Sequence, residues 1–452
     1  MSPKQTVLQN LAAACLAGEW SVAGLAERGA EAWGQREAWL RRLSGRLLKQ
    51  FGEAPSRLDL PALVRFLEQD AGFRKAWHRH ATQQELPLKR IFWVSETMTP
   101  APGPPSSWPV PALPSPGALA EWLGIATEEL DRFADCHGRE RRAPSGPLRH
   151  YAYRWLTKAN GKARLLEVPK ARLRVIQRRV LHEILDLVPP HDAAHGYRRG
   201  HSVATCVGPH CGRAVVLCVD LRDFFPSIRA SRVHALFRTA GYPASVARLL
   251  TGLCTNSVPD DVLAQWPQRE RRAASWESRQ RFRFAHLPQG APTSPALANL
   301  CAHRLDRRLA GLAASAGASY TRYADDLVFS GDRELERCLR RFHVAVCRIA
   351  LEEGFEVHTR KSRFMCQAVR QQVAGIVLNA HPNIDRHEYD RLKAILTNCV
   401  RHGPHGQNRS GQADFRGHLA GRIAYVGMLN PARGQKLRTL FDRIRWEGDP
   451  GA

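Results

Sequence analysis

A proline-rich segment divides this chain into two parts of different character. Residues 100–116 (PAPGPPSSWPVPALPSP) contain eight prolines. Proline lacks a backbone N–H and fixes φ, so this stretch can form neither a helix nor a central strand. We expect a semi-rigid linker over residues 99–117. At 452 residues, the chain is long enough for two or three domains around it.

The part before the linker, residues 1–98, has the apolar spacing of helices. Steps of three and four residues put one set of apolar side chains on a single helix face: Trp33, Leu40, Leu43, Leu47, Leu48 and Phe51. The basic residues between them form either a solvated face or a face for nucleic acid. We predict an N-terminal helical extension here and a short helical connector over residues 118–146.

From about residue 147, strand-like runs alternate with helical ones. Tyr151–Trp155 and Ala163–Val168 flank Asn160-Gly161, a common signal for a tight hairpin. Arg172–Leu187 has helical spacing, and Val215–Val219 is a continuous apolar run typical of a buried strand. Helical spacing returns in the tail. The mixture predicts an α+β fold.

The chain carries a large excess of positive charge. Lys and Arg number 67 against 42 Asp and Glu, for a formal net charge of +25. Such a surplus favours a polyanionic partner, nucleic acid above all, although an Arg-rich genome would give the same composition. No apolar run approaches the roughly 18–20 residues that a membrane helix needs, so we expect no membrane partner.

The cysteines indicate a reducing compartment. There are eleven, scattered along the chain, which is typical of reduced thiols in the cytoplasm. One local cluster contains His201, Cys206, His210 and Cys211. Its spacing matches no common zinc pattern, so we interpret these four as packing residues.

Three acidic residues lie at the ends of strand-like runs. Asp220 comes directly after Val215–Val219, and Asp325-Asp326 joins the strand-like runs Tyr320–Tyr323 and Leu327–Phe329. Carboxylates at the edge of a core cost several kcal/mol unless they are neutralised. Mg²⁺ prefers such oxygen ligands, and two ions about 3.5–4 Å apart can activate a 3′-hydroxyl and stabilise a leaving pyrophosphate. These are the requirements of nucleotidyl transfer, although an Asp-Asp doublet taken alone favours an ordinary turn.

Three segments resemble motifs of the reverse transcriptases, in that family's order. Tyr323-Ala324-Asp325-Asp326 resembles the YxDD motif. Residues 219–228 (VDLRDFFPSI) are similar to the first catalytic-Asp segment of the bacterial branch, and residues 287–295 (LPQGAPTSP) match the segment that faces nucleotide and template. The resemblance covers roughly residues 147–446. It implies a right-hand polymerase, with fingers and palm over 147–380 and a helical thumb over 381–452.

The resemblance also implies roles for the acids and their neighbours. Asp220, Asp325 and Asp326 would be the catalytic residues and would bind two Mg²⁺ ions, with the Leu221 carbonyl as a further ligand. Phe225 takes the position of the steric gate. A ring packed under the sugar leaves no room for a 2′-hydroxyl, so deoxynucleotides are selected.

Further residues are implied as nucleotide-binding. Gln289-Gly290 fits a site of close backbone approach, because glycine has no side chain. Arg164 lies in a segment that resembles the fingers strand gripping the triphosphate, and Arg forks match phosphate oxygens well. Lys361 takes the place of the family's Lys near the triphosphate, where it acts as a proton donor or only as a charge.

Within the family, two segments resemble the retron group. They are residues 194–202 (AHGYRRGHS) and residues 372–379 (QVAGIVLN), with Ala374 in place of Thr. Where the group carries Asn-Ala-x-x-His, residues 206–210 (CVGPH) keep only the His. The resemblance implies RNA-directed DNA synthesis from deoxynucleoside triphosphates on a structured non-coding RNA.

The retron resemblance implies partners as well. They are the structured RNA as template and primer, an RNA–DNA hybrid product with a branch, and an effector protein in anti-phage defence. Two alternatives remain at this point. One is another bacterial reverse transcriptase, of a group II intron-like or other defence-associated branch. The other is a catalytically silent RNA-binding scaffold.

Overall fold

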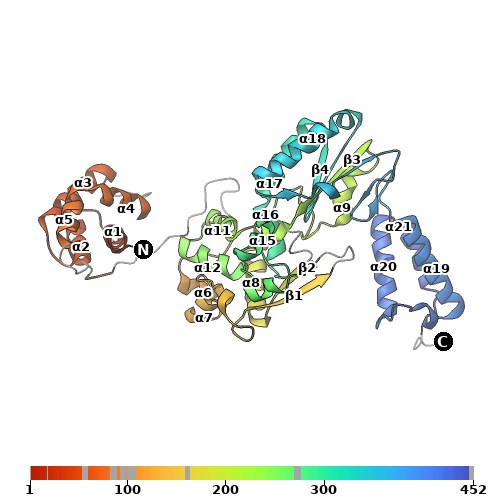
Figure 1. Cartoon of the computed structure of the whole chain (residues 1–452), viewed down its shortest axis with the longest axis horizontal. Coiled ribbons are helices and arrows are strands. Elements are labelled where there is room, and N and C mark those ends of the chain that lie inside the picture. The colour runs from red at the N-terminus through yellow and green to blue at the C-terminus, as the bar shows by residue number, and fades with distance from the viewer. Residues whose placement is uncertain are drawn as a thin grey trace. The chain divides into compact units, whose positions relative to one another are not determined.

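The chain forms two compact units in a computed structural model, Met1–Thr97 and Met98–Ala452. The structure describes residues 2–17, 19–52, 60–81, 89–91, 98, 108–157, 163–268 and 276–446. Figure 1 labels the elements along the chain. No helix of the described residues has both the length and the apolar character that crossing a bilayer requires.

The described residues of the first unit are mainly helical. Trp33 packs edge-to-face against Trp39, with ring centroids 5.2 Å apart. The expectation that Trp33 shares a helix with Leu40–Phe51 is wrong, because the helix that contains Trp33 ends there and the next begins at Ala38. The described helices of this unit are α1 (Pro3–Leu16), α2 (Val22–Trp33), α3 (Ala38–Phe51), α4 (Leu60–Gln69) and α5 (Ala71–Ala81).

The second half of the expected linker is packed structure. Residues 99–107 lie outside the described residues. Residues 108–115 have no regular secondary structure, but Leu113 is only 3% exposed and Trp108 and Val110 pack against the core of the second unit. Pro116 then begins a helix capped by the Ser115 side chain. Apolar side chains between the prolines therefore tie this segment down.

The second unit combines helices with an antiparallel sheet, which confirms the α+β prediction. The helices described between Pro116 and Lys361 are α6 (Pro116–Leu123), α7 (Thr127–Ala134), η1 (Glu140–Arg142), α8 (Ala171–Glu183), η2 (Leu185–Leu187), α9 (Val203–Val207), η3 (Gly208–His210), α10 (Phe224–Ser227), α11 (Ala230–Thr239), α12 (Ala244–Cys254), α13 (Asp260–Ala264), α15 (Trp276–Arg283), α16 (Ser294–Cys301), α17 (His303–Ser315), α18 (Arg333–Glu352) and η4 (Thr359–Lys361).

The strands fall into one larger sheet and two hairpins. The larger sheet has the order β4-β5-β3-β6, and β7 also pairs with β3. β1 pairs with β2, and β8 with β9. The strands are β1 (Tyr151–Thr157), β2 (Ala163–Pro169), β3 (Val215–Arg222), β4 (Ser319–Tyr323), β5 (Asp326–Gly331), β6 (Glu356–Val357), β7 (Arg363–Cys366), β8 (Gln372–Val373) and β9 (Ile376–Val377).

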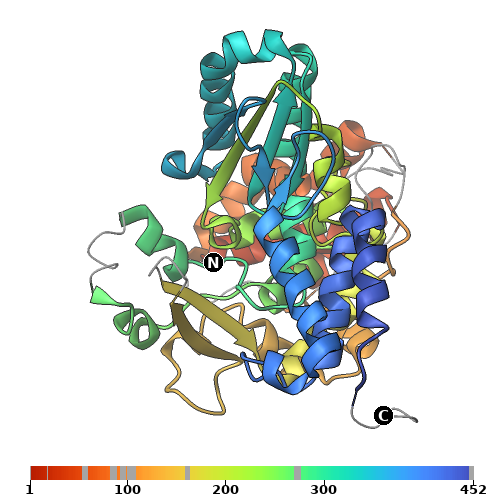
Figure 2. The same ribbon diagram turned by 90° about the vertical axis from the view of Figure 1, so that its right-hand side faces the viewer.

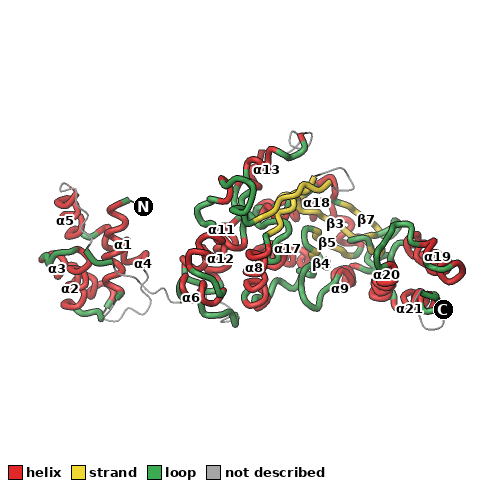
Figure 3. The backbone as a smooth tube through the Cα atoms, turned by 90° about the horizontal axis from the view of Figure 1, so that it is seen from below, coloured by secondary structure: helices red, strands yellow, loops and turns green. Residues whose placement is uncertain are grey.

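β3 is buried on both faces, which explains its continuous apolar run. Successive side chains of a strand point to opposite faces. Leu217 and Val219 belong to the core that includes α8, α12, α17 and α18, whereas Val216 and Cys218 belong to the core shared with the C-terminal helices. Figure 3 shows β3, β5 and β7 side by side within this unit.

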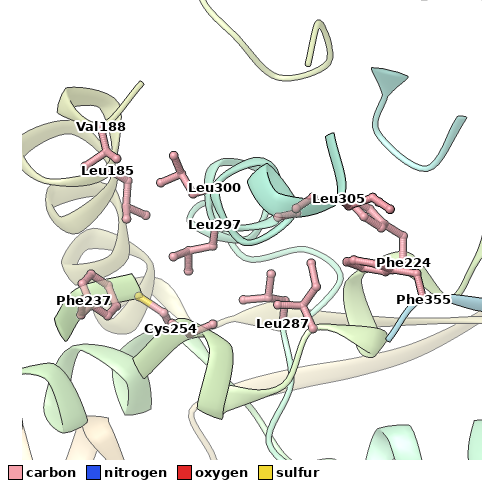
Figure 4. Close-up of a cluster of buried hydrophobic side chains, with 14 of the residues drawn as sticks. Leu185, Val188, Phe224, Phe237, Cys254, Leu287, Leu297, Leu300, Leu305 and Phe355 are labelled. Atoms are coloured by element: carbon pink, nitrogen blue, oxygen red, sulfur yellow. The ribbon is translucent and has the colours of Figure 1, made fainter. Parts of the chain in front are cut away.

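An apolar cluster lies beneath the end of β3. Figure 4 shows Leu297 and Leu300 of α16 between Leu185 on one side and Phe224 on the other. Phe224 is buried and packs against Phe355, with ring centroids 5.5 Å apart. A fully buried side chain of this size contributes about 1.5–3 kcal/mol, so the cluster gives the end of β3 a rigid base.

Capped helices follow the sheet. The Asp385, Asp414 and Asn430 side chains each accept a hydrogen bond from the first turn of the helix they precede. Pro431 at the first helical position needs no donor there. Figure 2 shows these helices alongside one another. They are α19 (Arg386–His402), η5 (His405–Gln407), α20 (Phe415–Leu429) and α21 (Pro431–Phe441).

Candidate active site

Two neighbouring strands bring the predicted catalytic acids together. Asp220 lies near the end of β3, and Asp326 begins β5 directly opposite it in the antiparallel register. Directly opposed side chains share a sheet face, with Cβ atoms about 4.5–5.5 Å apart. Asp325 joins them from the turn, where its carbonyl accepts a 2.9 Å hydrogen bond from the Leu221 amide. Acids distant in sequence thus meet at one end of the sheet.

Ala324 makes the turn between β4 and β5 sharp. Its φ is 56°, in the left-handed region. For a residue with a Cβ atom this costs about 1–2 kcal/mol. Strain of this kind persists where the surroundings fix the conformation. Here the Ala324 carbonyl accepts a 3.1 Å hydrogen bond from the Arg322 guanidinium, which holds the turn that presents Asp325 and Asp326.

Burial first, and neighbouring carboxylates second, raise the pKa of Asp325 and of Asp326. Burial is the larger cause at Asp326, and the charges of Asp325 and Asp220 add to it, which raises the pKa of Asp326 to about 6. Burial also raises the pKa of Asp325, with a further contribution from Asp220. A cation among these carboxylates would favour their ionised forms and remove the repulsion.

Lys361 supplies one positive charge to this cluster. Its Nζ donates hydrogen bonds of 2.9 and 2.7 Å to the two carboxylate oxygens of Asp220. The segment is fixed in place, because the His358 amide donates to the Asp220 carbonyl at 2.7 Å. The structure therefore places Lys361 on a predicted metal ligand, a contact that the sequence analysis did not foresee.

The donor set suits a hard divalent cation. Mg²⁺ typically takes one or two carboxylates and completes its shell with water and substrate phosphates. Within the described ranges, no group of three or more His, Cys, Asp or Glu side chains is arranged around one metal position. A pair of carboxylates is still enough for Mg²⁺, because water and substrate oxygens supply the remaining ligands.

The β1–β2 hairpin carries Arg164 near the acids. Arg164 is exposed and lies opposite Leu156 in the hairpin register. Its positive charge lowers the pKa of Asp325, partly offsetting the rise that burial causes. The predicted turn at Asn160-Gly161 lies outside the described residues, whereas the pairing of its two strands is as expected.

Gln289-Gly290 is attached to the same hairpin. The Gln289 carbonyl accepts a 2.8 Å hydrogen bond from the Glu167 amide of β2. Gly290 has φ of 130°, and a Cβ atom there would lie 3.0 Å from the Glu167 carbonyl. The buried Glu167 carboxylate also pairs with His286 at 3.0 Å. Glycine is needed at 290 because the hairpin strand itself approaches closely.

Phe225 follows the acidic end of β3 on the short helix α10. Its half-buried ring lies 5.8 Å from the Phe224 ring and 6.2 Å from the Tyr197 ring. Asp223, which precedes the helix, pairs with Arg281 at 3.3 Å. This ion pair supports a structural role for Asp223 and fixes the start of the helix that positions Phe225.

A buried ion pair beneath the turn was not predicted. Arg322 and Asp306 are both 0% exposed in their side chains, and two hydrogen bonds of 2.7 and 2.6 Å join them. Arg322 also donates to the Asn299 side chain at 3.0 Å, and the Tyr320 hydroxyl donates to Asp306 at 2.8 Å. A signal was present in the sequence, because an Arg inside an apolar strand requires a buried partner.

His210 and Cys206 lie behind β4 and β5. The buried His210 ring bonds to the hydroxyls of Ser330 and Thr321 at 2.7 and 2.8 Å. Cys206 Sγ lies 3.2 Å from the Thr321 hydroxyl. Burial lowers the pKa of His210 to about 3, so the ring is neutral. These contacts are those of packing residues that support the hairpin.

Comparison with protein families adds an independent finding. Residues 156–393 match the family model described as "Reverse transcriptase (RNA-dependent DNA polymerase)". The match covers more than half of the chain. It includes every site residue predicted from the sequence.

Curated relatives carry a more specific description. The Retron Mx65 reverse transcriptase of Myxococcus xanthus is 39% identical over 327 residues, which cover 71% of this chain and 69% of the relative. The Retron Mx162 reverse transcriptase of the same organism is 34% identical over 337 residues, 72% of this chain and 65% of the relative. The Retron Ec86 reverse transcriptase of Escherichia coli is 30% identical over 284 residues, which cover 63% of this chain and 77% of the relative.

Proposed function

This chain belongs to the reverse transcriptases of the retron type, which are RNA-directed DNA polymerases, and from this premise we propose that Asp220, Asp325 and Asp326 form its catalytic centre. The observation that carries the proposal is the register of β3 and β5, which sets Asp220 opposite Asp326 and joins the Leu221 amide to Asp325. A domain of this family depends on divalent metal in general.

The metal we propose is a pair of Mg²⁺ ions. Asp220 and Asp325 would hold them, with Asp326 and the Leu221 carbonyl completing the protein's share. When bound, such a pair activates the primer hydroxyl and stabilises the departing pyrophosphate. The support lies in the crowded carboxylates, because burial, and after it the charge of the neighbouring acids, raises the pKa of Asp325 and of Asp326.

The nucleotide site that we propose lies between the acids and the β1–β2 hairpin. Arg164 would bind the triphosphate, and Lys361 would reach the phosphates from its place beside Asp220, where it would donate a proton or supply charge. Gln289-Gly290 borders the nucleotide and template. Phe225 closes the site under the sugar and excludes a 2′-hydroxyl.

We also propose the right-hand arrangement of a polymerase. Fingers and palm correspond to residues 147–380 and the thumb to 381–452, after an N-terminal extension over 1–98 and a connector over 118–146. Support comes from the hairpin that carries Arg164, the sheet that carries the acids and the capped helices α19–α21 that follow.

The substrates and partners that we propose are those that the resemblance to the retron group implies. The enzyme copies a structured non-coding RNA with deoxynucleoside triphosphates, releases a branched RNA–DNA product, and acts with an effector protein in anti-phage defence. The net charge of +25 supports a polyanionic partner. All eleven cysteines are free, which supports a cytoplasmic location.

The test is Mg²⁺-dependent deoxynucleotide incorporation on a primed RNA template. Asp325→Asn should lower the rate at least about 100-fold, because the centre loses charge where the transition state needs it, while RNA affinity stays unchanged. Asp332→Asn, at the exposed residue between β5 and α18, is the matched control and should extend at the wild-type rate. Wild-type extension by Asp325→Asn would overturn the proposal, and equal RNA binding without synthesis in wild type would favour the scaffold alternative.

A further inference from the structure

The segment before Tyr197 is fixed along β4. Ala194 forms a parallel bridge with Arg322, the His195 amide donates to the Arg322 carbonyl at 2.8 Å, and the Arg322 amide donates to the Ala193 carbonyl at 2.7 Å. Because β4 leads directly into the acidic turn, this segment reaches the same end of the sheet.

Gly196 packs against the turn without a gap. A Cβ atom at this position would lie 2.8 Å from the Ala324 amide nitrogen, a distance that real side chains do not tolerate. The Gly196 carbonyl accepts a 2.7 Å hydrogen bond from the buried Asn299 side chain. The position of the next residue, Tyr197, is therefore set by the same buried groups that hold the turn.

Tyr197 itself has a strained backbone and an open ring. Its φ is 57°, in the left-handed region that few residues with a Cβ atom adopt. The residue is 53% exposed, so core packing does not account for this conformation. Strained residues of this kind cluster at ligand sites, where the surrounding structure holds them.

Three predicted site residues and Tyr323 of the YxDD-like motif lie near the Tyr197 ring. Its centroid lies 6.2 Å from the Phe225 ring and 6.4 Å from the Tyr323 ring, both within the range of interacting aromatic pairs. Burial raises the pKa of Tyr197, Asp325 raises it further, and Arg164 lowers it, so both charges lie within electrostatic range. Tyr197 thus borders the space between the acids, the fingers hairpin and the gate.

We propose that Tyr197 is a specificity-determining residue, whose ring holds Phe225 in place and so forms with it a two-ring wall against the 2′-hydroxyl of a ribonucleotide. This inference rests on the proposed role of Phe225. Among the described residues, the Phe225 ring has two aromatic neighbours, which are Phe224 at 5.8 Å and Tyr197 at 6.2 Å. Without the Tyr197 ring, Phe225 gains freedom to turn away, and a ribose then fits.

The experiment measures kcat/KM for a deoxynucleotide and for the matching ribonucleotide in the full-length enzyme. Tyr197→Ala should lower the ratio of the two about three- to tenfold, as expected for one aromatic pair. Alanine keeps the Cβ atom, so the backbone strain is unchanged. Tyr197→Phe keeps the ring and should keep the ratio. Phe364→Ala, which removes another half-exposed ring, is the matched control.

Phe225→Ala separates the proposal from its premise. It should lower the ratio more than Tyr197→Ala does, and the double variant should be no worse than Phe225→Ala, because Tyr197 acts through that ring. If Phe225→Ala lowers the ratio of deoxynucleotide to ribonucleotide kcat/KM and Tyr197→Ala does not, the proposed role of Tyr197 is wrong. Phe225 then remains the steric gate. If neither changes the ratio, the gate assignment itself fails.

Two further results would also overturn the role of Tyr197. One is an equal fall in kcat/KM for both nucleotides, which indicates general support of the site rather than sugar selection. The other concerns folding. Should Tyr197→Ala unfold, Tyr197→Leu provides the same comparison with an apolar side chain, and an unchanged ratio in that variant contradicts the proposal.

Discussion

Arg322 connects the buried interior to the catalytic turn. Its guanidinium binds the Asp306 carboxylate, the Asn299 side chain and the Ala324 carbonyl, and it lies 5.5 Å from the centre of the Phe224 ring. An uncompensated buried charge is costly, so the acid and the guanidinium depend on one another. One residue thus supports both the acidic turn and the base of the helix that carries the proposed gate.

This arrangement predicts that stability and synthesis can be separated. Arg322→Met should lower the free energy of unfolding by about 3–5 kcal/mol, because Asp306 is left buried without a partner. Adding Asp306→Leu should restore most of that stability, since both charges are then gone. Synthesis should stay at least about tenfold below wild type, because the Ala324 carbonyl still lacks its donor.

Denaturant unfolding and primer extension, measured on the same preparations, check this prediction. Wild-type synthesis by the double variant would show that the ion pair serves stability alone. An Arg322→Met variant as stable as wild type would contradict the energetic argument itself.

Single residues differed in how far the sequence could predict them. Asp220 could be recognised because it follows an apolar strand, where a carboxylate is unexpected, and Asp325 because its segment resembles the YxDD motif. The partners of Arg322 could not be recognised, since no periodic pattern links a strand residue to an acid on α17. The contact between Lys361 and Asp220 was also missed, because it depends on how η4 packs beside β3.

At the scale of elements, the β4–β5 hairpin depends on a neutral histidine. His210 of η3 bonds to Thr321 on β4 and Ser330 on β5, and the Thr321 hydroxyl also donates to the Cys206 carbonyl at 3.0 Å. Burial is the main reason that the pKa of His210 falls to about 3, and the nearby charges of His195 and Arg213 act in the same direction. Protonating this ring would separate the hairpin from its support.

The lowered pKa predicts how stability changes with pH. Below the ordinary histidine pKa of about 6.5, the unfolded chain binds a proton that the folded ring does not accept until about pH 3. The unfolded state then holds more protons, so the free energy of unfolding falls as the pH decreases. His210 alone contributes up to about 1.4 kcal/mol per pH unit across this window.

Unfolding curves at about pH 7.5, 6 and 5 check this prediction in wild type and His210→Gln. The variant cannot titrate at this position, so its slope should be smaller by about 1 kcal/mol per pH unit. The values at pH 7.5 give the cost of the substitution itself, because the wild-type ring is neutral there in both states. Equal slopes would contradict the account.

Long elements with clear patterns were predicted, and short ones were not. The apolar run of β3 and the two strands around the acidic doublet correspond to observed strands. The strands β6 and β7 have two and four residues, too few for any period to be visible. The Trp33 assignment failed because spacing alone cannot reveal that four intervening residues leave the helix.

The two units have separate apolar cores, and the whole chain has a strongly basic composition. One core lies within the first unit, and the others lie within the second, which contains all proposed catalytic residues. The proline-rich composition predicted where regular structure stops, but not that residues 108–115 pack on the second core, because packing depends on distant partners.

The net charge predicts strongly salt-dependent RNA binding. An enzyme that contacts many phosphates releases condensed ions on binding, so its affinity for a structured RNA should fall roughly 100-fold or more between about 50 and 200 mM salt. Titrations at several salt concentrations, with Asp325→Asn to prevent synthesis, give the slope. A fall of less than about threefold would indicate that the charge of +25 is not directed at RNA.

The central claim is that Asp220 and Asp325 hold the metal ions of nucleotidyl transfer. The most direct measurement is the anomalous scattering of Mn²⁺ in crystals of the full-length enzyme with RNA template, DNA primer and a non-hydrolysable deoxynucleoside triphosphate. The account predicts two peaks about 3.5–4 Å apart, both bonded to these carboxylates, with Lys361 no longer on Asp220. Peaks elsewhere, or a Lys361 that still occupies both oxygens of Asp220, would contradict it.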